Sequence, residues 1–271
     1  MVELFESDIR SDERRSSKGN QLKWKSGNQW YKADYTGYEG LSEYVVSSLL
    51  MHSNLIEDEY VIYYPEQIRY GSQVYNGVRS DDFLSGDWQI ITAERCYKSF
   101  YGESLNSVIY RTESLSDRLK RIVDDMARIT GLDGLGIYMS KLLTIDAFFL
   151  NEDRHTHNIA VLTNGMGEYR LCPFFDQGAS LLAETTMDYP LGDDVYKLID
   201  KVKPKTFCQD FSEQLDIAEN LYGEHIRFSF THKDIDNILA GLPEGMYSDQ
   251  IINRVRTILY EQMRKYRYLF D

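Results

Sequence analysis

The sequence has few cysteines and no long apolar stretch. Its 271 residues include only three cysteines, Cys96, Cys172 and Cys208, which excludes a disulfide framework and a multi-cysteine zinc cluster. No segment reaches the roughly 18 uninterrupted apolar residues of a membrane span, and the charged first residues lack the apolar core of a signal peptide. We therefore expect a cytoplasmic protein, with reduced thiols in its interior and no membrane partner.

Basic residues are also fewer than acidic residues. The chain has 30 lysines and arginines against 43 aspartates and glutamates, a formal net charge of −13. Such a charge repels phosphate backbones, so we expect no direct nucleic-acid binding. What the chain has is a content of 42% hydrophobic and 13% aromatic residues, enough to bury a substantial core. These figures predict a folded protein of enzyme size.

The periodicity of apolar residues changes along the chain from a strand pattern to a helical one. Runs with Trp and Tyr at 21–25 and 29–34 flank Ser26-Gly27-Asn28, the composition of a hairpin turn. Residues 60–100 continue the strand pattern, and 88–93 reads as a buried strand. The sequence therefore predicts an α+β fold, sheet-rich first and helical later. The expected helices are 38–51, 115–130 ending at Gly131, 135–150, 206–221, 231–241 and 247–269.

A strongly polar loop follows the apolar helix expected at 135–150. It reads Asn151-Glu-Asp-Arg-His-Thr-His-Asn158. Asp, Asn, Arg and His cost free energy when they are buried without partners. The loop is therefore better explained as a functional site than as packing.

The spacing of the acidic and amide residues in this region matches phosphoryl-transfer chemistry. That chemistry needs a carboxylate near the attacking hydroxyl and oxygen ligands for magnesium. Kinases supply them as an Asp, an Asn five residues later, and the Asp of an Asp-x-Gly turn after a hairpin. Asp153, Asn158 and Asp176 have that order, and Asn164-Gly165 predicts the hairpin between them. We interpret the three as catalytic base and two metal ligands.

The same chemistry requires a strand lysine that contacts the nucleotide phosphates and a helix carboxylate that holds it. Lys32 lies on the second strand of the first predicted hairpin. Glu43, on the following helix, is the first choice as its partner, and Glu39 is the second. Without the downstream residues, Lys32 would read as an ordinary exposed lysine.

These motifs together resemble the HipA-like family of bacterial serine/threonine protein kinases. Gly19-Asn20-Gln21-Leu22-Lys23 resembles the family's Gly-x-Gln-x-Lys start, and Asn151 to Asn158 resembles its N-x-D-R-H-x-x-N catalytic loop. Phe174-Phe175-Asp176-Gln177-Gly178 resembles its metal-binding turn. The resemblance implies a two-lobed protein-kinase-like fold that binds ATP and Mg²⁺ and phosphorylates a serine or threonine of a protein substrate.

Carried over residue by residue, the resemblance assigns further positions. Asp153 would be the base, Lys32 would contact phosphates, and Arg154 and His155 belong to the catalytic loop, where Arg154 orients the loop or meets a phosphate. The expected ATP contacts are Ser17, Gly19, Gln21, Lys32, Glu43, Asn158, Asp176 and a hinge at Glu94 and Cys96. Ser16 or Ser17 is the expected autophosphorylation site.

The resemblance also predicts a domain division. Residues 1–95 would form the ATP-binding lobe. Residues 1–15 would be a mobile arm, because they carry charges of both signs and few apolar residues. Residues 96–271 would form the helical lobe with the catalytic loop. Longer family members carry an extra amino-terminal subdomain and act as toxins held by a DNA-binding antitoxin, whereas this chain resembles the compact members. A toxin role and an antitoxin or other regulatory partner are thus allowed but not required.

Two alternatives stay open at this point. A small-molecule kinase for an alcohol or a sugar would share every nucleotide-binding residue named above. A nucleotide-binding regulatory module without activity would be expected to lack the base or a metal ligand, and this chain has both.

Overall fold

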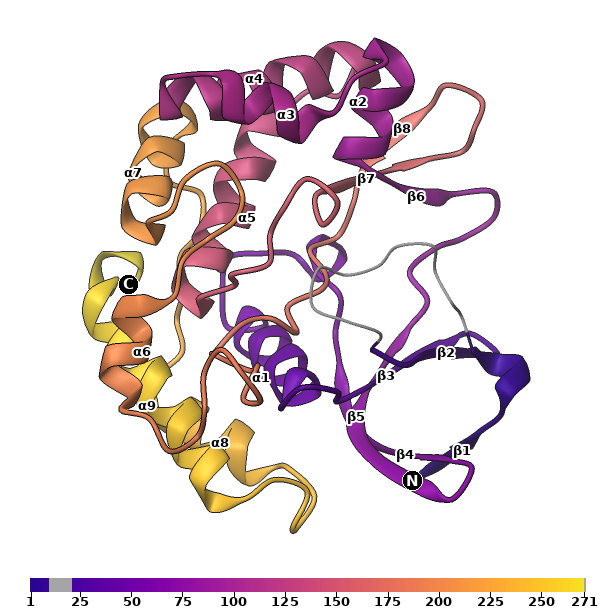
Figure 1. Cartoon of the computed structure of the whole chain (residues 1–271), viewed down its shortest axis with the longest axis vertical. Coiled ribbons are helices and arrows are strands. Elements are labelled where there is room, and N and C mark those ends of the chain that lie inside the picture. Colours follow the sequence, from indigo (N-terminus) through magenta and orange to yellow (C-terminus); the bar gives the residue numbers. More distant parts are fainter. Residues whose placement is uncertain (10–20, 271) are drawn as a thin grey trace. The chain divides into compact units, whose positions relative to one another are not determined.

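The computed structural model describes residues 1–9 and 21–270 (Figure 1). The chain divides into two compact units. The first comprises Met1–Phe83, Phe175–Val202 and Arg227–Asp271, and the second comprises Leu84–Phe174 and Lys203–Ile226. Both units are discontinuous in sequence, whereas the predicted lobes, 1–95 and 96–271, are continuous. The functional division into those lobes stays a prediction.

The first unit is built on a five-stranded sheet in the order β1-β4-β5-β3-β2. The predicted hairpin is present: β2 (Lys23–Ser26) pairs antiparallel with β3 (Gln29–Ala33), and Gly27 in the turn adopts a φ of 59°. Because only glycine adopts this left-handed conformation without strain, Gly27 permits the tight connection. The remaining strands are β1 (Val2–Leu4), β4 (Tyr64–Tyr70) and β5 (Gln73–Asp81).

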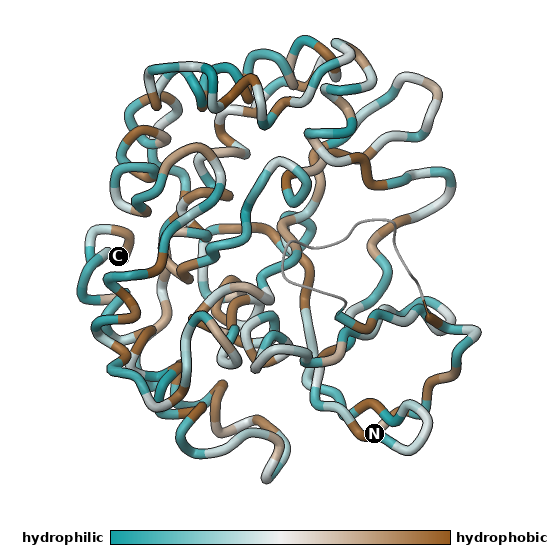
Figure 2. Tube along the Cα trace, viewed as in Figure 1, coloured by the Kyte–Doolittle hydropathy of each residue, from teal (hydrophilic) through white to brown (hydrophobic). Residues whose placement is uncertain are grey.

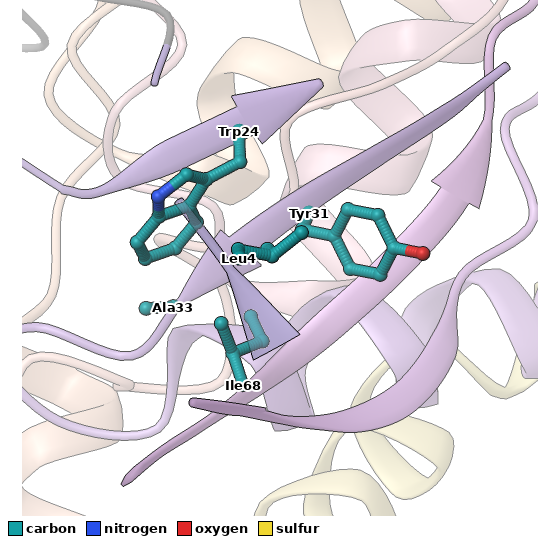
Figure 3. Packing of buried hydrophobic residues seen from close by; sticks show 5 residues of the cluster. All are labelled: Leu4, Trp24, Tyr31, Ala33 and Ile68. Atoms are coloured by element: carbon teal, nitrogen blue, oxygen red, sulfur yellow. The ribbon is translucent and has the colours of Figure 1, made fainter. Parts of the chain in front are cut away.

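The start of the chain is part of this sheet. β1 pairs in parallel with β4, and Leu4 lies in a buried cluster with Trp24, Tyr31, Ala33 and Ile68 (Figure 3). The prediction of a mobile arm is therefore wrong for residues 1–9, because β1 pairs with β4 and Leu4 is buried. Residues 10–15 of that predicted arm lie outside the described residues.

Helix α1 (Glu39–Leu50) packs on β3, β4 and β5 and confirms the helix predicted at 38–51. The same unit contains α6 (Val195–Lys201), α8 (His232–Ala240) and α9 (Asp249–Lys265), and α9 packs against both α6 and α8. Short 3-10 turns occur at Glu6–Asp8, Glu57–Glu59 and Arg267–Leu269.

The second unit combines a three-stranded antiparallel sheet with five helices among its described residues. The strand order is β6 (Gln89–Thr92), β7 (Ala160–Thr163), β8 (Tyr169–Leu171), and the β7–β8 connection carries the predicted Asn164-Gly165 turn. Its helices are α2 (Ala93–Tyr101), α3 (Leu105–Arg111), α4 (Leu115–Thr130), α5 (Leu135–Phe149) and α7 (Phe211–Tyr222).

Two helix ends in this unit show which local signals determined the boundaries. α4 ends at Gly131, which has a φ of 69°, as predicted. α7 begins at Phe211 rather than at 206, because the Asp210 side chain accepts a hydrogen bond from the Glu213 amide and caps the helix there.

Hydrophobic residues occur in short stretches along both units (Figure 2). No helix in the described part of the chain is long and apolar enough to cross a bilayer. Cys96, Cys172 and Cys208 are buried free thiols, which confirms the prediction that they are packing residues.

Asp34, directly after β3, is a partly buried carboxyl group whose titration should change the stability of the protein with pH. Its Oδ1 accepts the Gly40 amide at 2.6 Å and its Oδ2 the Tyr247 hydroxyl at 2.9 Å. Burial raises the pKa of Asp34 to about 7, although these two hydrogen bonds oppose the increase. Between about pH 4 and pH 7 the native state therefore binds more protons than the unfolded state, so stability falls as pH rises.

We expect Asp34→Asn, which resembles the protonated carboxyl group, to remove this dependence. The free energy of unfolding of the variant should fall by about 2 kcal/mol less than that of the wild type between roughly pH 5 and pH 8. Urea unfolding at the two pH values measures the difference. The same pH dependence in both proteins would contradict the assignment.

Candidate active site

Lys32 is the centre of a buried ionic cluster in the first unit, which we call the lysine cluster: Lys32, Glu43, Tyr63 and Asp176. The Lys32 Nζ atom lies 2.5 Å from Glu43 Oε1 and 2.9 Å from Asp176 Oδ1, and it donates to the Tyr63 hydroxyl at 3.4 Å. The Glu43 side chain is 1% exposed, and that of Asp176 is 24% exposed. Glu43 therefore acts as a fixed anchor, and Asp176 is the carboxylate with access to a ligand.

The strand and the helix bring these residues together by their ordinary geometry. Lys32 lies on β3 between β2 and β5, and Glu43 lies on α1, which packs on the same sheet. A Cβ added to Gly77 on β5 would lie 2.1 Å from the Lys32 carbonyl oxygen. The absence of a side chain at Gly77 thus permits the close strand pairing that positions Lys32.

The Lys32–Glu43 pair confirms the first choice made from the sequence. The alternative partner, Glu39, instead accepts hydrogen bonds from the amides of Tyr35, Thr36 and Gly37 at the start of α1. Glu39 is therefore a structural residue of the β3–α1 connection.

The turn that contains Asp176 is attached to α1 by three hydrogen bonds. The Gln177 amide donates to Glu43 Oε2 at 2.8 Å, and the Ser42 hydroxyl contacts the carbonyl oxygens of Gln177 at 2.8 Å and Ser180 at 3.0 Å. Asp176 itself has a φ of 62°, a left-handed conformation that is uncommon outside glycine. The fold thus holds Asp176 in a costly conformation beside Lys32, as expected of a functional residue rather than a packing residue.

The electrostatic state of Lys32 is well defined. Burial by itself would lower its pKa, but the carboxylates of Asp176 and Glu43 raise the pKa of Lys32 well above its ordinary value. The ammonium therefore stays charged throughout the physiological range. Its stabilising contribution is fully present below the pKa of an unfolded lysine and is lost only as pH rises through the higher folded pKa.

The catalytic loop, Asn151 to Asn158, lies in the second unit and is held by a buried ion pair. Arg154 Nε lies 2.9 Å from Asp146 Oδ2, with side chains 2% and 0% exposed. The Asn151 amide group donates to the same carboxylate at 2.9 Å, and Arg154 also donates to the Asn158 carbonyl oxygen at 2.9 Å. Of the two functions predicted for Arg154, the structure therefore supports loop orientation and not phosphate contact.

Asp153 is buried, with a side chain that is 8% exposed, and lies beside three groups. The Asn158 side-chain nitrogen donates to the Asp153 carbonyl oxygen at 2.8 Å. His155 Nε2 and Lys205 Nζ lie 3.9 Å and 3.8 Å from Asp153 Oδ1. The predicted base thus has a neighbouring amide, an imidazole and an ammonium.

Asn158 and Asp176, the predicted metal ligands, each offer an oxygen, the kind of donor that magnesium binds together with substrate phosphates. The nitrogen of the Asn158 side chain is used on Asp153, so Oδ1 is the atom that can ligate a cation. Asp176 offers the partly exposed carboxylate described above. Within residues 1–9 and 21–270, no cluster of three or more His, Cys, Asp or Glu side chains could hold a metal by itself.

The predicted adenine hinge is not an extended segment. Glu94 and Cys96 lie in the first turns of α2, which Thr92 caps by accepting the Arg95 amide. The Glu94 amide already donates to the Thr156 carbonyl oxygen at 3.1 Å. Its carboxylate accepts from the Thr156 hydroxyl and the Asn106 amide, each at 3.0 Å. Glu94 thus supports the predicted catalytic loop, and the adenine contacts of Glu94 and Cys96 stay a prediction.

The glycine-containing start of the motif is only partly described. Ser17 and Gly19 lie outside the described residues, as does Ser16. Gln21 is described, and its side-chain nitrogen donates to the Ala33 carbonyl oxygen at 2.9 Å, one residue beyond Lys32. Gln21 therefore ties this segment to the strand that carries Lys32.

Three contributors to the site were not recognised as such from the sequence. Asp146 is the only carboxylate within the apolar helix α5, and a lone acidic residue in such a helix is the signal that could have found it. Tyr63 belongs to the lysine cluster through its contact with Lys32, and Thr206 donates a hydrogen bond to the catalytic loop. Neither residue lies in a sequence pattern that distinguishes it.

Comparison with known proteins identifies the fold. No family model matches the sequence, and no curated protein matches it significantly. Among solved structures, the chain is similar to the Helicobacter pylori proinflammatory kinase CtkA, with a TM-score of 0.64 and 14% identity over 97% of this chain and 95% of that one. It also matches Shewanella oneidensis HipA from a complex with HipB and operator DNA, with a TM-score of 0.41 and 12% identity over 88% of this chain and 58% of that one. The CtkA likeness, along nearly the whole of both chains, confirms the kinase-like fold of the compact type.

Proposed function

We propose that the protein is an ATP- and Mg²⁺-dependent serine/threonine protein kinase. The observation that carries this proposal is the lysine cluster, in which a strand lysine is held by a buried helix glutamate and by the Asp of an Asp-x-Gly turn. This set is what a kinase uses to hold nucleotide phosphates and their metal ion. The fold similarity to CtkA supports the same conclusion.

In the proposed reaction the residues of this chain position and neutralise charge. Lys32 would bind the α- and β-phosphates of ATP, and Asn158 and Asp176 would hold magnesium. Bound magnesium would supply positive charge to the phosphate oxygens. Asp153 would accept the proton of the attacking hydroxyl as its oxygen bonds to the γ-phosphorus, and the β,γ-bridging P–O bond would break with its electron pair leaving on ADP.

Several finer assignments belong to this proposal. A hydroxyl of the chain itself, at Ser16 or Ser17, is the first candidate acceptor. A cytoplasmic location fits the three buried free thiols. A toxin role and an antitoxin or other regulatory partner depend only on the resemblance of the motifs.

Identification of the molecule that accepts the phosphoryl group tests the proposal against its alternatives. The purified protein is incubated with γ-labelled ATP and Mg²⁺, alone and with a bacterial cell extract separated into protein and small-molecule fractions. Label in protein serine or threonine is the expected result. Label only in small molecules would favour an alcohol or sugar kinase, and ATP-dependent thermal stabilisation without transfer would favour a regulatory module.

Glu43→Gln should reduce activity through the position of Lys32. The variant keeps the size of the side chain but loses a charge-assisted hydrogen bond, a contribution of about 1.5–3 kcal/mol. We expect kcat/KM for ATP to fall about 10- to 100-fold. Glu39→Gln, on the same helix but without contact to Lys32, is the control and should lower kcat/KM far less. Equal losses in the two variants would contradict the anchoring function of Glu43.

A further inference from the structure

A short extended segment after α6 reaches the catalytic loop. Along residues 203–206 exposure alternates: Lys203 and Lys205 are exposed, whereas Pro204 and Thr206 are buried. The Thr206 hydroxyl donates to the Arg154 carbonyl oxygen at 2.6 Å. This hydrogen bond fixes the register of the segment against the catalytic loop within the second unit.

Because of this register, Lys205 is the cation beside the predicted base. Its Nζ atom lies 3.8 Å from Asp153 Oδ1, and its side chain is 45% exposed. At that distance the two groups form an ion pair without a hydrogen bond, so the ammonium donors are not committed to Asp153. Lys203 is exposed on the same side of the segment as Lys205, but no ion pair with Asp153 is described for it.

The position of Lys205 relative to Asp153 determines what it can reach. An acceptor hydroxyl must lie about 2.6–3.2 Å from the carboxylate that takes its proton. The phosphorus that bonds to this hydroxyl, and the oxygens on it, then lie within the reach of a flexible lysine side chain paired with the same carboxylate. In a chain with a net charge of −13, an ammonium at this position is not explained by a generally basic surface.

We propose that Lys205 is a catalytic residue that binds the oxygens of the γ-phosphoryl group during transfer. This inference rests on the proposed function and adds a second cation to Lys32. In the step, the hydroxyl oxygen bonds to phosphorus, the bridging P–O bond breaks with its electrons on ADP, and the hydroxyl proton passes to Asp153. Lys205 exchanges no proton and offsets the charge on the three equatorial oxygens.

The test measures transfer to two acceptors in the full chain. With γ-labelled ATP and Mg²⁺, label on the protein itself and labelled inorganic phosphate released to water are counted together, so no substrate protein needs to be known. Lys205→Met removes the charge and keeps most of the side chain. We expect both rates to fall about 100-fold at saturating ATP, with the KM for ATP within about twofold of the wild type.

Matched variants separate this function from others. Lys205→Arg keeps the charge and should retain activity within about tenfold of the wild type, and Lys203→Met should match the wild type. If Lys205→Met has a lowered Tm, Lys205→Gln replaces it. Lys205→Met with wild-type rates would overturn the inference, as would a loss of protein labelling without a loss of hydrolysis, which would indicate acceptor recognition. A wild-type protein that releases and transfers no phosphate would overturn the proposed function itself.

Discussion

Replacement of Asp153 by Asn is expected to reduce phosphoryl transfer about 1,000-fold while the protein stays folded. General base catalysis contributes roughly 10²- to 10⁴-fold in rate, and the amide of Asn cannot accept the proton. The loop itself should persist, because the buried pair of Arg154 and Asp146 holds it. Initial rates with γ-labelled ATP measure the first expectation, and thermal unfolding measures the second.

The control for this experiment is Asp216→Asn, which makes the same change in charge on an exposed position of α7 in the same unit. It should have the wild-type rate. ATP should raise the Tm of Asp153→Asn as much as that of the wild type, because nucleotide affinity is assigned to Lys32. An Asp153→Asn variant with more than about a tenth of the wild-type rate would remove Asp153 as the base.

Asp146→Ala is expected to cause the largest loss of stability. It leaves the buried Arg154 guanidinium without its carboxylate partner and removes the acceptor of the Asn151 side chain. Removal of one partner of a buried ion pair costs about 3–5 kcal/mol, which corresponds to a decrease in Tm of about 10 °C for a protein of this size. Denaturant and thermal unfolding measure the change.

A double variant distinguishes the unpaired charge from simple loss of packing. Asp146→Leu with Arg154→Met replaces both charges by apolar groups of similar size and should recover much of the stability, because no buried charge remains unpaired. It should not recover activity, since the catalytic loop loses its orientation. If Asp146→Ala costs less than about 1 kcal/mol, as an exposed substitution would, the pair does not support the loop.

The features that could be predicted from the sequence have local signals. Gly131 ends α4, Asn164-Gly165 turns between β7 and β8, and Gly27 turns between β2 and β3, because each position requires a particular backbone conformation. The pairing of Lys32 with Glu43 was also predicted from the sequence, and the ion pair between them confirms it. The order and spacing of Asp153, Asn158 and Asp176 predicted the catalytic base and the two metal ligands.

The features that were missed depend on contacts between distant segments. β1 is stabilised by pairing with β4, more than sixty positions later in the sequence, which the charged composition of the first residues concealed. Asp146 has a function only beside Arg154, with which it forms a buried ion pair. The Thr206 hydrogen bond to the catalytic loop, which has no local signal, accompanies the approach of Lys205 to Asp153.

The segment at Glu94 combines a local signal with distant contacts. Thr92 is a strong helix N-cap, and that local preference determined where α2 begins. The contacts of Glu94 with Thr156 and Asn106 have no local signal in the sequence.

The most direct test of the account is mass spectrometry of the purified protein after incubation with ATP and Mg²⁺, for the wild type beside Asp153→Asn and Asp176→Asn. The account predicts phosphoserine or phosphothreonine on the wild-type chain or on an added bacterial protein, and none in either variant. Phosphorylation that persists in both variants, or a wild-type protein whose Tm ATP does not raise and which transfers no phosphate, would contradict it.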